Sequence, residues 1–245
     1  MISIVIPAYN NIELFKTAIL SVLKQKDAVF EIIVSDDSKS TDIEDYCLQL
    51  RDPRIRYYRN IPSKGAIDNW NYGLSLAKGE YLILLHHDES FINPDYLSRI
   101  GQLLEKYDVA IHSKTVMCTS GVKTDKIPEW VKKIAINLKY PLFSLNVIGP
   151  CACVAIKRSV YKEFDNRLHW KVDTEWYFRI LRKARNVYYS SSLEILSHHG
   201  HEGQITNTID IKETNKKDIV CIKQKYGSPF VSMFVVLGQL LQKFK

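Results

Sequence analysis

The sequence predicts an α/β fold in which helices cover both faces of a mostly parallel β-sheet. In the first half of the chain, short apolar runs rich in β-branched residues alternate with segments of helical periodicity. The apolar runs are almost continuous, which is typical of parallel strands that are buried on both faces. With 245 residues, of which 46% are hydrophobic and 25% charged, the chain fits one large globular domain.

The first predicted unit is a strand, a helix and a second strand. The strand ISIVIP covers residues 2–7, a helix begins at Asn11, and the strand EIIVSD covers residues 31–36. One face of the helix is apolar and consists of Ile12, Phe15, Ala18, Ile19 and Val22. This order is that of a βαβ unit, which joins two parallel strands.

The next predicted elements complete the first half of the chain. Thr41 and Glu44 have the spacing of a capping box, which predicts the start of a second helix. The run RIRYYRN at residues 54–60 indicates a strand, and residues 66–78 indicate a helix that Gly79 closes. A fourth strand, YLILLH, begins at residue 81.

The second half is less regular. A helix is expected after Asn93-Pro94, a strand at DVAIHSKTVM, an exposed loop over residues 118–127 and a short helix over residues 130–138. The run CACVAI indicates a strand on which Cys151 and Cys153 share one face as packing residues.

An amphipathic helix, DTEWYFRILRKA, is expected to begin at Asp173, with Trp176, Tyr177, Ile180 and Leu181 on its apolar face. We divide the chain into a main domain, residues 1–207, and a helical tail, residues 208–245.

Charge and cysteine content narrow the classes of partner and compartment. The net charge of +7 and the pI near 9.0 favour contact with an anion. No Arg/Lys run interleaves with aromatic residues, which argues against nucleic acid as a partner. The five cysteines are odd in number and scattered, and the N-terminus reads as a buried strand instead of a signal peptide. We therefore expect a cytoplasmic protein.

Polar residues follow the first, second and fourth predicted strands. They are Ala8-Tyr9-Asn10, Asp36-Asp37-Ser38 and His86-His87-Asp88-Glu89. Ligands of such sheets bind at the carboxyl ends of the strands, so these residues are candidates for a site. The Asp36-Asp37 pair can accept hydrogen bonds from a nucleobase or a ribose, although a turn before the next helix explains it equally well.

The acidic residues after the fourth strand suggest a cation. Unpaired charge is costly at the end of an apolar strand, and a divalent ion held by one carboxylate and by diphosphate oxygens would compensate it. A turn that caps the following helix is the alternative. The histidines at residues 197–202 lack HExxH or CxxC spacing, so a zinc site is disfavoured. One of these histidines contacts a metal or diphosphate, or all of them are surface residues.

The segments IVIPAYN, VSDDS, GEYLILLHHDE and DTEWYFR, in this order, resemble family 2 glycosyltransferases over roughly the first 200 residues. The resemblance implies the Rossmann-like GT-A fold and transfer of a sugar, with inversion, from a UDP or dTDP sugar to an acceptor hydroxyl. It also implies a divalent metal cofactor, Mn²⁺ or Mg²⁺. A dinucleotide fold and a P-loop are disfavoured, because neither GxGxxG nor a Walker A sequence is present.

The same resemblance assigns residues to the nucleotide. The segment Pro7-Ala8-Tyr9 and Asp37 match positions that hold the uracil or thymine base, and Asn71 matches an asparagine that lines the nucleotide pocket. The Asp-x-Asp motif of the family falls on His86-His87-Asp88, so its first Asp is a histidine here. His87 and Asp88 are assigned to the nucleotide site.

The metal and the catalytic base are assigned in the same way. Asp88 matches the metal-binding Asp, and His201 is the nearest match to a histidine that joins the metal. Asp173 matches the general base, with Arg179 six residues later, although the glutamate that precedes the base is Val172 here. Taken alone, Asp173 is an acid that the helix dipole favours. Glu175 is the reserve base.

Two other functions remain open at this stage. The chain could be an inactive nucleotide-sugar binding protein, since one Asp of Asp-x-Asp is missing, or a sugar nucleotidyltransferase, although PAYNN lacks the required Gly-rich loop. For an active enzyme, the acceptor is expected to be a glycan or a lipid-linked glycan in cell-surface polysaccharide synthesis.

The tail contains SPFVSMFVVLGQLLQKFK, whose apolar stretch is shorter than the roughly 20 residues that span a bilayer. We expect an interfacial helix on the anionic inner face of the cell membrane. Packing on the domain, or on a second subunit in an oligomer, is the alternative.

Overall fold

A computed structural model shows a mixed α/β fold with a mostly parallel sheet and confirms the predicted fold class. It describes residues 1–118, 121–124, 127–201, 203–204, 207 and 209–242. Within these residues, nine strands form one sheet in the order β3-β2-β1-β4-β8-β6-β9-β5, and β7 pairs with β6.

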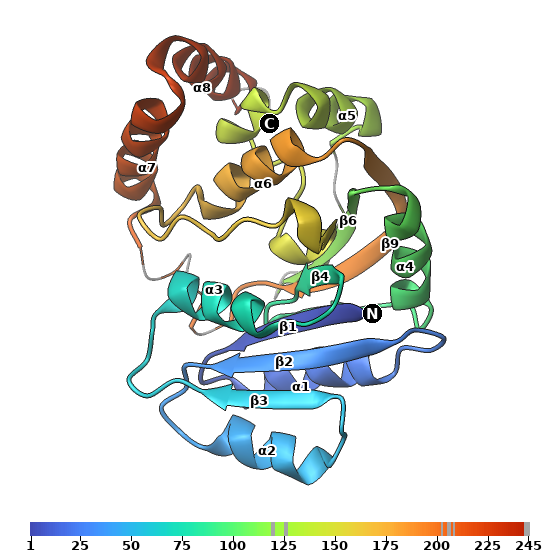
Figure 1. Ribbon diagram of the computed structural model, residues 1–245. Coiled ribbons are helices and arrows are strands. Elements are labelled where there is room, and N and C mark those ends of the chain that lie inside the picture. Colours follow the sequence, from blue (N-terminus) through green and yellow to red (C-terminus); the bar gives the residue numbers. More distant parts are fainter. Residues whose placement is uncertain (119–120, 125–126, 202, 205–206, 208, 243–245) are drawn as a thin grey trace.

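The first half of the sheet is entirely parallel. It consists of β1 (Ile2–Ala8), β2 (Phe30–Asp36), β3 (Ile55–Arg59) and β4 (Tyr81–Leu84). The connecting helices are α1 (Ile12–Leu23), α2 (Asp42–Leu50) and α3 (Ala66–Leu76). The chain moves outward from β1 to β3 and then returns to place β4 on the other side of β1. Because crossovers are right-handed, α3 covers the face opposite α1 and α2 (Figure 1).

The second half of the sheet mixes strand directions. The strands are β5 (Glu89–Phe91), β6 (Val109–Cys118), β7 (Gly121–Thr124), β8 (Val154–Lys157) and β9 (Val187–His198). Strand β8 is antiparallel to both β4 and β6, whereas β6 and β9 run parallel. The long pairing of β6 with β9 brings the histidine-rich segment after β9 to the same edge as the end of β4, where His198 N–H donates to Asp88 C=O.

The remaining helices are α4 (Tyr96–Lys106), α5 (Glu129–Leu138), α6 (Val172–Lys183), α7 (Ile211–Tyr226) and α8 (Ser228–Gln242). The short 3₁₀ turns are η1 (Tyr140–Phe143), η2 (Cys151–Cys153) and η3 (Arg158–Val160). In Figure 1, α5 to α8 gather above the sheet. The predicted apolar face of α6 is buried, with Trp176, Tyr177, Ile180 and Leu181 all in the core.

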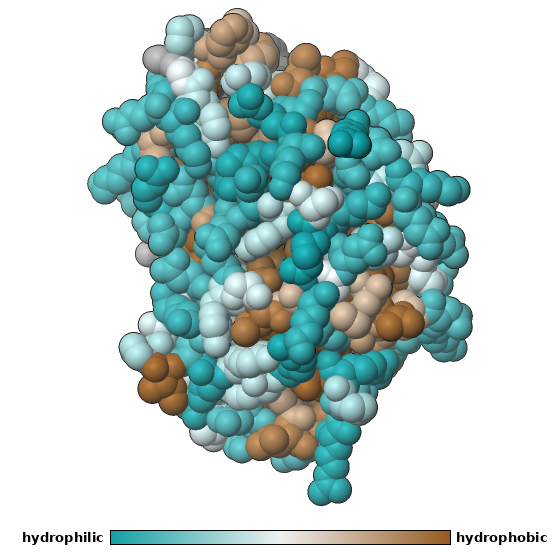
Figure 2. Space-filling model, viewed as in Figure 1, coloured by the Kyte–Doolittle hydropathy of each residue, from teal (hydrophilic) through white to brown (hydrophobic). Residues whose placement is uncertain are grey.

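The tail packs on the rest of the chain through one face and exposes another. The ring of Tyr140 stacks on Phe234, and Val231 is fully buried. The exposed apolar residues of α8 are Phe230, Met233, Val236 and Leu237. Figure 2 shows hydrophobic side chains at the top of the view, where α8 and α5 lie in Figure 1. Among the helices within the described ranges, none is long and apolar enough to cross a membrane.

The structure corrects two local predictions in the first half. Thr41 and Glu44 form no capping box, because Thr41 Oγ1 donates to Asp45 and Glu44 pairs with Arg59. Helix α3 ends at Leu76, before Gly79. Gly79 is needed for packing instead, since a Cβ there would lie 2.6 Å from Ser3 Oγ.

Two predictions in the second half are also wrong. The segment 118–127 is not simply a loop, because Gly121–Thr124 pairs with β6 as β7; residues 119–120 and 125–126 lie outside the described residues. CACVAI is not one strand, since Cys151–Cys153 forms a 3₁₀ turn and β8 begins at Val154. Both cysteines are nevertheless buried, as expected for packing residues.

Candidate active site

The candidate site begins at the carboxyl ends of β1 and β4, where the strand order reverses. Pro7 and Ala8 are buried, whereas Tyr9 is 42% exposed. His87 Nδ1 lies 3.3 Å from the carbonyl oxygen of Pro7, so the ends of the two strands are tied together. Burial lowers the pKa of His87, which keeps its ring neutral near pH 7.

Asp37 lies at the end of β2 and is 4% exposed. Its carboxylate accepts hydrogen bonds from Asn60 Nδ2 at 2.7 Å, Ser63 Oγ at 2.9 Å and the N–H of Gly65 at 2.7 Å. The N–H of Lys64 also points at this carboxylate, 3.1 Å from Oδ2. The carboxylate therefore holds the segment that leads into α3, and a nucleobase N–H would join or displace these donors. The predicted base contact stays a prediction.

Helix α3 packs closely on the parallel strands. A Cβ at Gly73 would lie 2.6 Å from Val5 Cγ1, so only glycine allows this approach. On the other side of α3, Asn71 Nδ2 donates to the carbonyl of Phe164 and Asn71 Oδ1 accepts its N–H. The amide of Asn71 is thus used to fix the chain at Phe164, and its predicted nucleotide contact stays untested.

Asp88 and His201 are brought together, although they are far apart in sequence. His201 Nε2 lies 3.1 Å from Asp88 Oδ2, and the two side chains are only 15% and 20% exposed. Burial raises the pKa of Asp88, but the bond to His201 and the charges of nearby histidines lower it more, so the carboxylate is ionised. Within the described part of the chain, no three His, Cys, Asp or Glu side chains form a metal cage. One carboxylate and one imidazole suit an ion whose other ligands come from a diphosphate.

His86 forms a buried pair with Glu89. Its Nδ1 lies 3.3 Å from Glu89 Oε2, and the same oxygen accepts the backbone N–H of His86 at 2.8 Å. Burial lowers the pKa of His86, but Glu89, Asp88 and Asp173 raise it to about 9. His86 is therefore a cation, at the position where the resemblance expects the first acid of the Asp-x-Asp pattern. Among the residues that the structure describes, its buried Nε2 has no hydrogen-bond partner. Its ring lies 4.7 Å from that of Trp70.

Asp173 occupies the first turn of α6 and contacts a residue that the sequence did not suggest. Cys151 Sγ donates to Asp173 Oδ1 at 3.3 Å, which leaves Oδ2 without that contact. Burial raises the pKa of the Asp173 carboxyl, while His86, the Cys151 bond and Lys114 lower it in part. A carboxyl with a raised pKa is a stronger base once it is ionised, which suits removal of a proton.

Glu175 cannot serve as the reserve base, because it is completely buried and its oxygens are paired. Arg179 binds it in a bidentate manner, with Nε 2.8 Å from Oε1 and Nη2 2.8 Å from Oε2. Lys225 Nζ lies 2.8 Å from Oε1, and Tyr226 Oη also donates to it. This network joins α6 to α7. Arg179 is thereby directed to the side of α6 that pairs with the tail.

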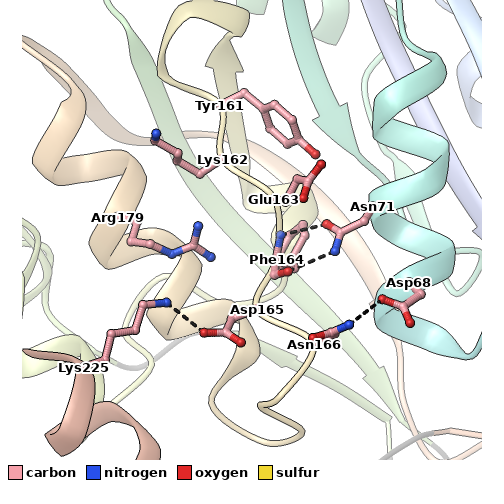
Figure 3. A pocket seen from close by; sticks show the side chains of 10 residues that line it. All are labelled: Asp68, Asn71, Tyr161, Lys162, Glu163, Phe164, Asp165, Asn166, Arg179 and Lys225. Atoms are coloured by element: carbon pink, nitrogen blue, oxygen red, sulfur yellow. Dashed lines mark hydrogen bonds and ion pairs between the residues drawn. The ribbon is translucent and has the colours of Figure 1, made fainter.

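Arg179 lines a separate pocket of about 690 Å³ between α3, α6, α7 and the segment before α6. Figure 3 shows Arg179 and Lys225 on one side of this pocket and Asn71 on the other, with Lys225 paired to Asp165. Arg179 and Lys225 are both also paired with Glu175, which lies behind the pocket wall on α6. None of the predicted catalytic or metal residues lines it.

Three residues in or near the site were not predicted from the sequence. Asn60 immediately follows β3, so the rule that polar residues after strands form the site could have found it. Cys151 and Lys114 had no such signal, because their roles depend on contacts between β6, η2 and α6.

Comparison with known proteins agrees with this arrangement. A family model described as Glycosyl transferase family 2 matches residues 3–165. An uncharacterized glycosyltransferase of Rickettsia typhi is 30% identical over 224 residues, which are 85% of this chain and 66% of that protein. The Escherichia coli UDP-Glc:alpha-D-GlcNAc-diphosphoundecaprenol beta-1,3-glucosyltransferase WfgD is 32% identical over 105 residues, which are 43% of this chain and 42% of that protein. The chain thus spans only part of the length of these relatives.

Solved structures show the same fold. S. aureus TarS, in complex with UDP-GlcNAc, superimposes with a TM-score of 0.73 at 16% identity over 96% of this chain and 71% of that chain. The mannosyltransferase PcManGT of Pyrobaculum calidifontis, in complex with GDP-Man and Mn²⁺, gives a TM-score of 0.68 at 13% identity over 97% of this chain and 68% of that chain.

Proposed function

Since this chain belongs to glycosyl transferase family 2, we propose that it transfers a sugar from a UDP or dTDP sugar to an acceptor hydroxyl with inversion. The main support is the grouping of Asp88, His201 and Asp173 around His86 at the carboxyl edge of the sheet. His86 is close enough to Asp88 and Asp173 for both carboxylates to raise its pKa. The two carboxylates have different environments: Asp88 is ionised beside a histidine, and Asp173 has a raised pKa. This difference suits metal binding by Asp88 and proton removal by Asp173.

In the proposed reaction, the acceptor hydroxyl oxygen forms a bond to the anomeric carbon of the donor. The bond from that carbon to the diphosphate breaks, and its electron pair leaves with the nucleoside diphosphate. Asp173 takes the hydroxyl proton, most directly through Oδ2, because Oδ1 faces Cys151. Removal of the proton requires a distance of about 2.6–3.2 Å between the two oxygens in the substrate complex.

Asp88 and His201 would hold the divalent cation of the reaction. When bound, the cation neutralises the negative charge that grows on the leaving diphosphate. An imidazole ligand favours Mn²⁺ over Mg²⁺, because Mg²⁺ prefers oxygen ligands. The pair Asp88–His201 also fixes the segment after β9 against the end of β4, so this segment would come close to the diphosphate.

The nucleoside would bind at the carboxyl ends of the parallel strands. The exposed side chain of Tyr9 is available to pack on a base, and Asp37, whose N–H donates to the C=O of Ala8, is buried at the end of β2. The choice of UDP or dTDP follows from the resemblance, and the named ligand of TarS, UDP-GlcNAc, agrees with it. Contacts of Pro7, Ala8, Asn71 and His87 with the nucleotide are part of the proposal and rest on the resemblance.

The acceptor is proposed to be a glycan or a lipid-linked glycan at the inner face of the cell membrane, in cell-surface polysaccharide synthesis. WfgD is named for a diphosphoundecaprenol-linked substrate, which supports a lipid-linked acceptor. The exposed face of α8 would rest on the anionic surface of the membrane. It carries Phe230, Met233 and Leu237, and α8 has no acidic residue in its first turn. Association of two copies through this face is the competing outcome.

The proposal is tested by incubating the wild-type chain with a panel of nucleotide sugars and Mn²⁺ and measuring slow donor hydrolysis by mass spectrometry. Release of UDP or dTDP from one donor is expected, while ADP sugars should remain intact. Binding of UDP without hydrolysis or transfer of any donor would favour an inactive nucleotide-sugar binding protein. Formation of a nucleotide sugar from a sugar phosphate and a nucleoside triphosphate would instead indicate a nucleotidyltransferase.

A further inference from the structure

Lys114 is a cation near the candidate site. It lies on β6, opposite Ile195 of β9, and its side chain is half-buried. In the described part of the chain, its ammonium group has no hydrogen bond or ion pair, whereas Lys157 on the adjacent strand β8 is paired with Asp108. A half-buried ammonium group without a partner loses hydration and gains nothing in return, so it is available for a ligand.

The position of Lys114 is set by a glycine. Gly149 has a φ of +114°, and a Cβ at this residue would lie 3.0 Å from Lys114 Cδ and 3.2 Å from Nζ. The lysine side chain therefore lies across the bare backbone of Gly149. That backbone is fixed, because its C=O accepts from Tyr177 Oη at 3.0 Å and Asn146 Nδ2 at 2.8 Å, and Asn146 Oδ1 accepts its N–H.

Lys114 lies close to two parts of the candidate site. It is three residues before Met117 on β6, and Met117 C=O accepts the N–H of His199, which follows β9. Gly149, against which the lysine side chain lies, accepts a hydrogen bond from Tyr177 of α6, the helix that carries Asp173. The charge of Lys114 lowers the pKa of the Asp173 carboxyl, which burial raises.

We propose that Lys114 binds a phosphate group of a substrate. The absence of a side chain at Gly149 leaves the space in which the lysine side chain lies. The proposal rests on the proposed function, whose donor carries a diphosphate. A phosphate oxygen would form the charge-assisted hydrogen bond that Nζ does not make with any described residue. Two sources have this chemistry, namely the diphosphate of the donor and the diphosphate of a lipid-linked acceptor.

The test compares Lys114→Met, which keeps the aliphatic stem, with the wild type and with Lys123→Met as a matched control. Lys123 is an exposed lysine of β7, the strand hairpinned to β6. Calorimetry measures the affinity for UDP and for uridine in the presence of Mn²⁺. It then measures the affinity for a short alkyl diphosphate with the nucleotide site filled by UDP.

If the donor supplies the phosphate, Lys114→Met should weaken UDP binding about 10-fold, the size of a lost charge-assisted hydrogen bond, and leave uridine unchanged. If the acceptor supplies it, UDP binding should be unchanged and alkyl diphosphate binding should fall by a similar factor. Equal affinities of wild type and Lys114→Met for both diphosphates would overturn the proposal, as would an equal loss in Lys123→Met.

Gly149→Ala provides an independent check, because its methyl group would displace the lysine. It should weaken binding of the same diphosphate in the wild-type background and have little further effect in Lys114→Met. Additive losses would show that Gly149 does not act through Lys114. These are binding measurements, so a wild-type chain that binds UDP but turns over no donor would refute the proposed function and leave the comparison of Lys114 variants intact.

Discussion

Replacing Asp218 by Asn should weaken the whole structure and disturb the start of the catalytic helix. Asp218 belongs to α7 in the tail, and its side chain is 1% exposed. Its carboxylate accepts the N–H of His169 at 3.1 Å, of Trp170 at 2.7 Å and of Lys171 at 2.7 Å. These residues lead directly into α6, so the tail holds the segment from which Asp173 projects.

The size of the effect follows from the number of bonds. Asn keeps one acceptor oxygen, loses the charge and turns an NH₂ group toward buried N–H donors. Hydrogen bonds to a charged group contribute about 1.5–3 kcal/mol and neutral ones about 0.5–1.5 kcal/mol, so each bond weakens by about 1 kcal/mol. For three bonds, we expect the free energy of unfolding to fall by about 2–3 kcal/mol.

Urea unfolding followed by tryptophan fluorescence measures this change. Glu213→Gln is the control, because Glu213 lies on the same helix in an exposed ion pair with Lys217. This substitution should change the free energy of unfolding by less than about 1 kcal/mol. The transfer rate of Asp218→Asn should also fall, while UDP affinity stays near that of the wild type. An unfolding free energy equal to that of Glu213→Gln would refute the view that the tail supports the active-site helix.

Three further predictions concern ligand, base and tail. UDP or dTDP with Mn²⁺ should stabilise the fold by about 2.7 kcal/mol at 100 times its Kd and raise the melting temperature, whereas an equal shift with ADP would contradict the base assignment. Cys151→Ala removes a hydrogen bond that lowers the pKa of Asp173. The acid limb of the pH profile of kcat/KM should therefore move to higher pH, and Cys151→Ser should restore its position. An unchanged acid limb would show that ionisation of Asp173 does not control kcat/KM at low pH. Deleting residues 228–245 should abolish sedimentation with anionic liposomes, and unchanged sedimentation would show that α8 serves only for packing or self-association.

The parallel half of the fold is predictable from sequence because its signals are local. Strands β1, β2 and β4 are apolar runs, β3 contains Ile55, Tyr57 and Tyr58, and α1 begins where Asn11 caps it by accepting the N–H of Leu14. Polar residues after these strands then meet by topology alone. This is why Tyr9, Asp37 and Asp88 could be assigned to one edge before any contact was known.

The other half depends on contacts between distant segments. Strand β9 was missed, because its residues 190–192 are three serines and its stability comes from pairing along most of β6. The distinction between Asp173 and Glu175 was equally hidden. Both are acids in the first turn of α6, and only the approach of Lys225 and Tyr226 from α7 shows that Glu175 faces inward.

The most direct test of the proposed mechanism measures nucleotide affinity and sugar transfer in Asp173→Asn and Asp88→Ala, with the donor identified by the screen. Asp173→Asn keeps the shape of the side chain but cannot take a proton, so UDP affinity should stay near the wild-type value and transfer should fall at least about 10²-fold. Asp88→Ala should weaken Mn²⁺-dependent UDP binding and transfer together, because its contact exists in both ground and transition states. Transfer by Asp173→Asn at a near-normal rate would contradict the account, since Glu175 is buried and paired and offers no replacement base.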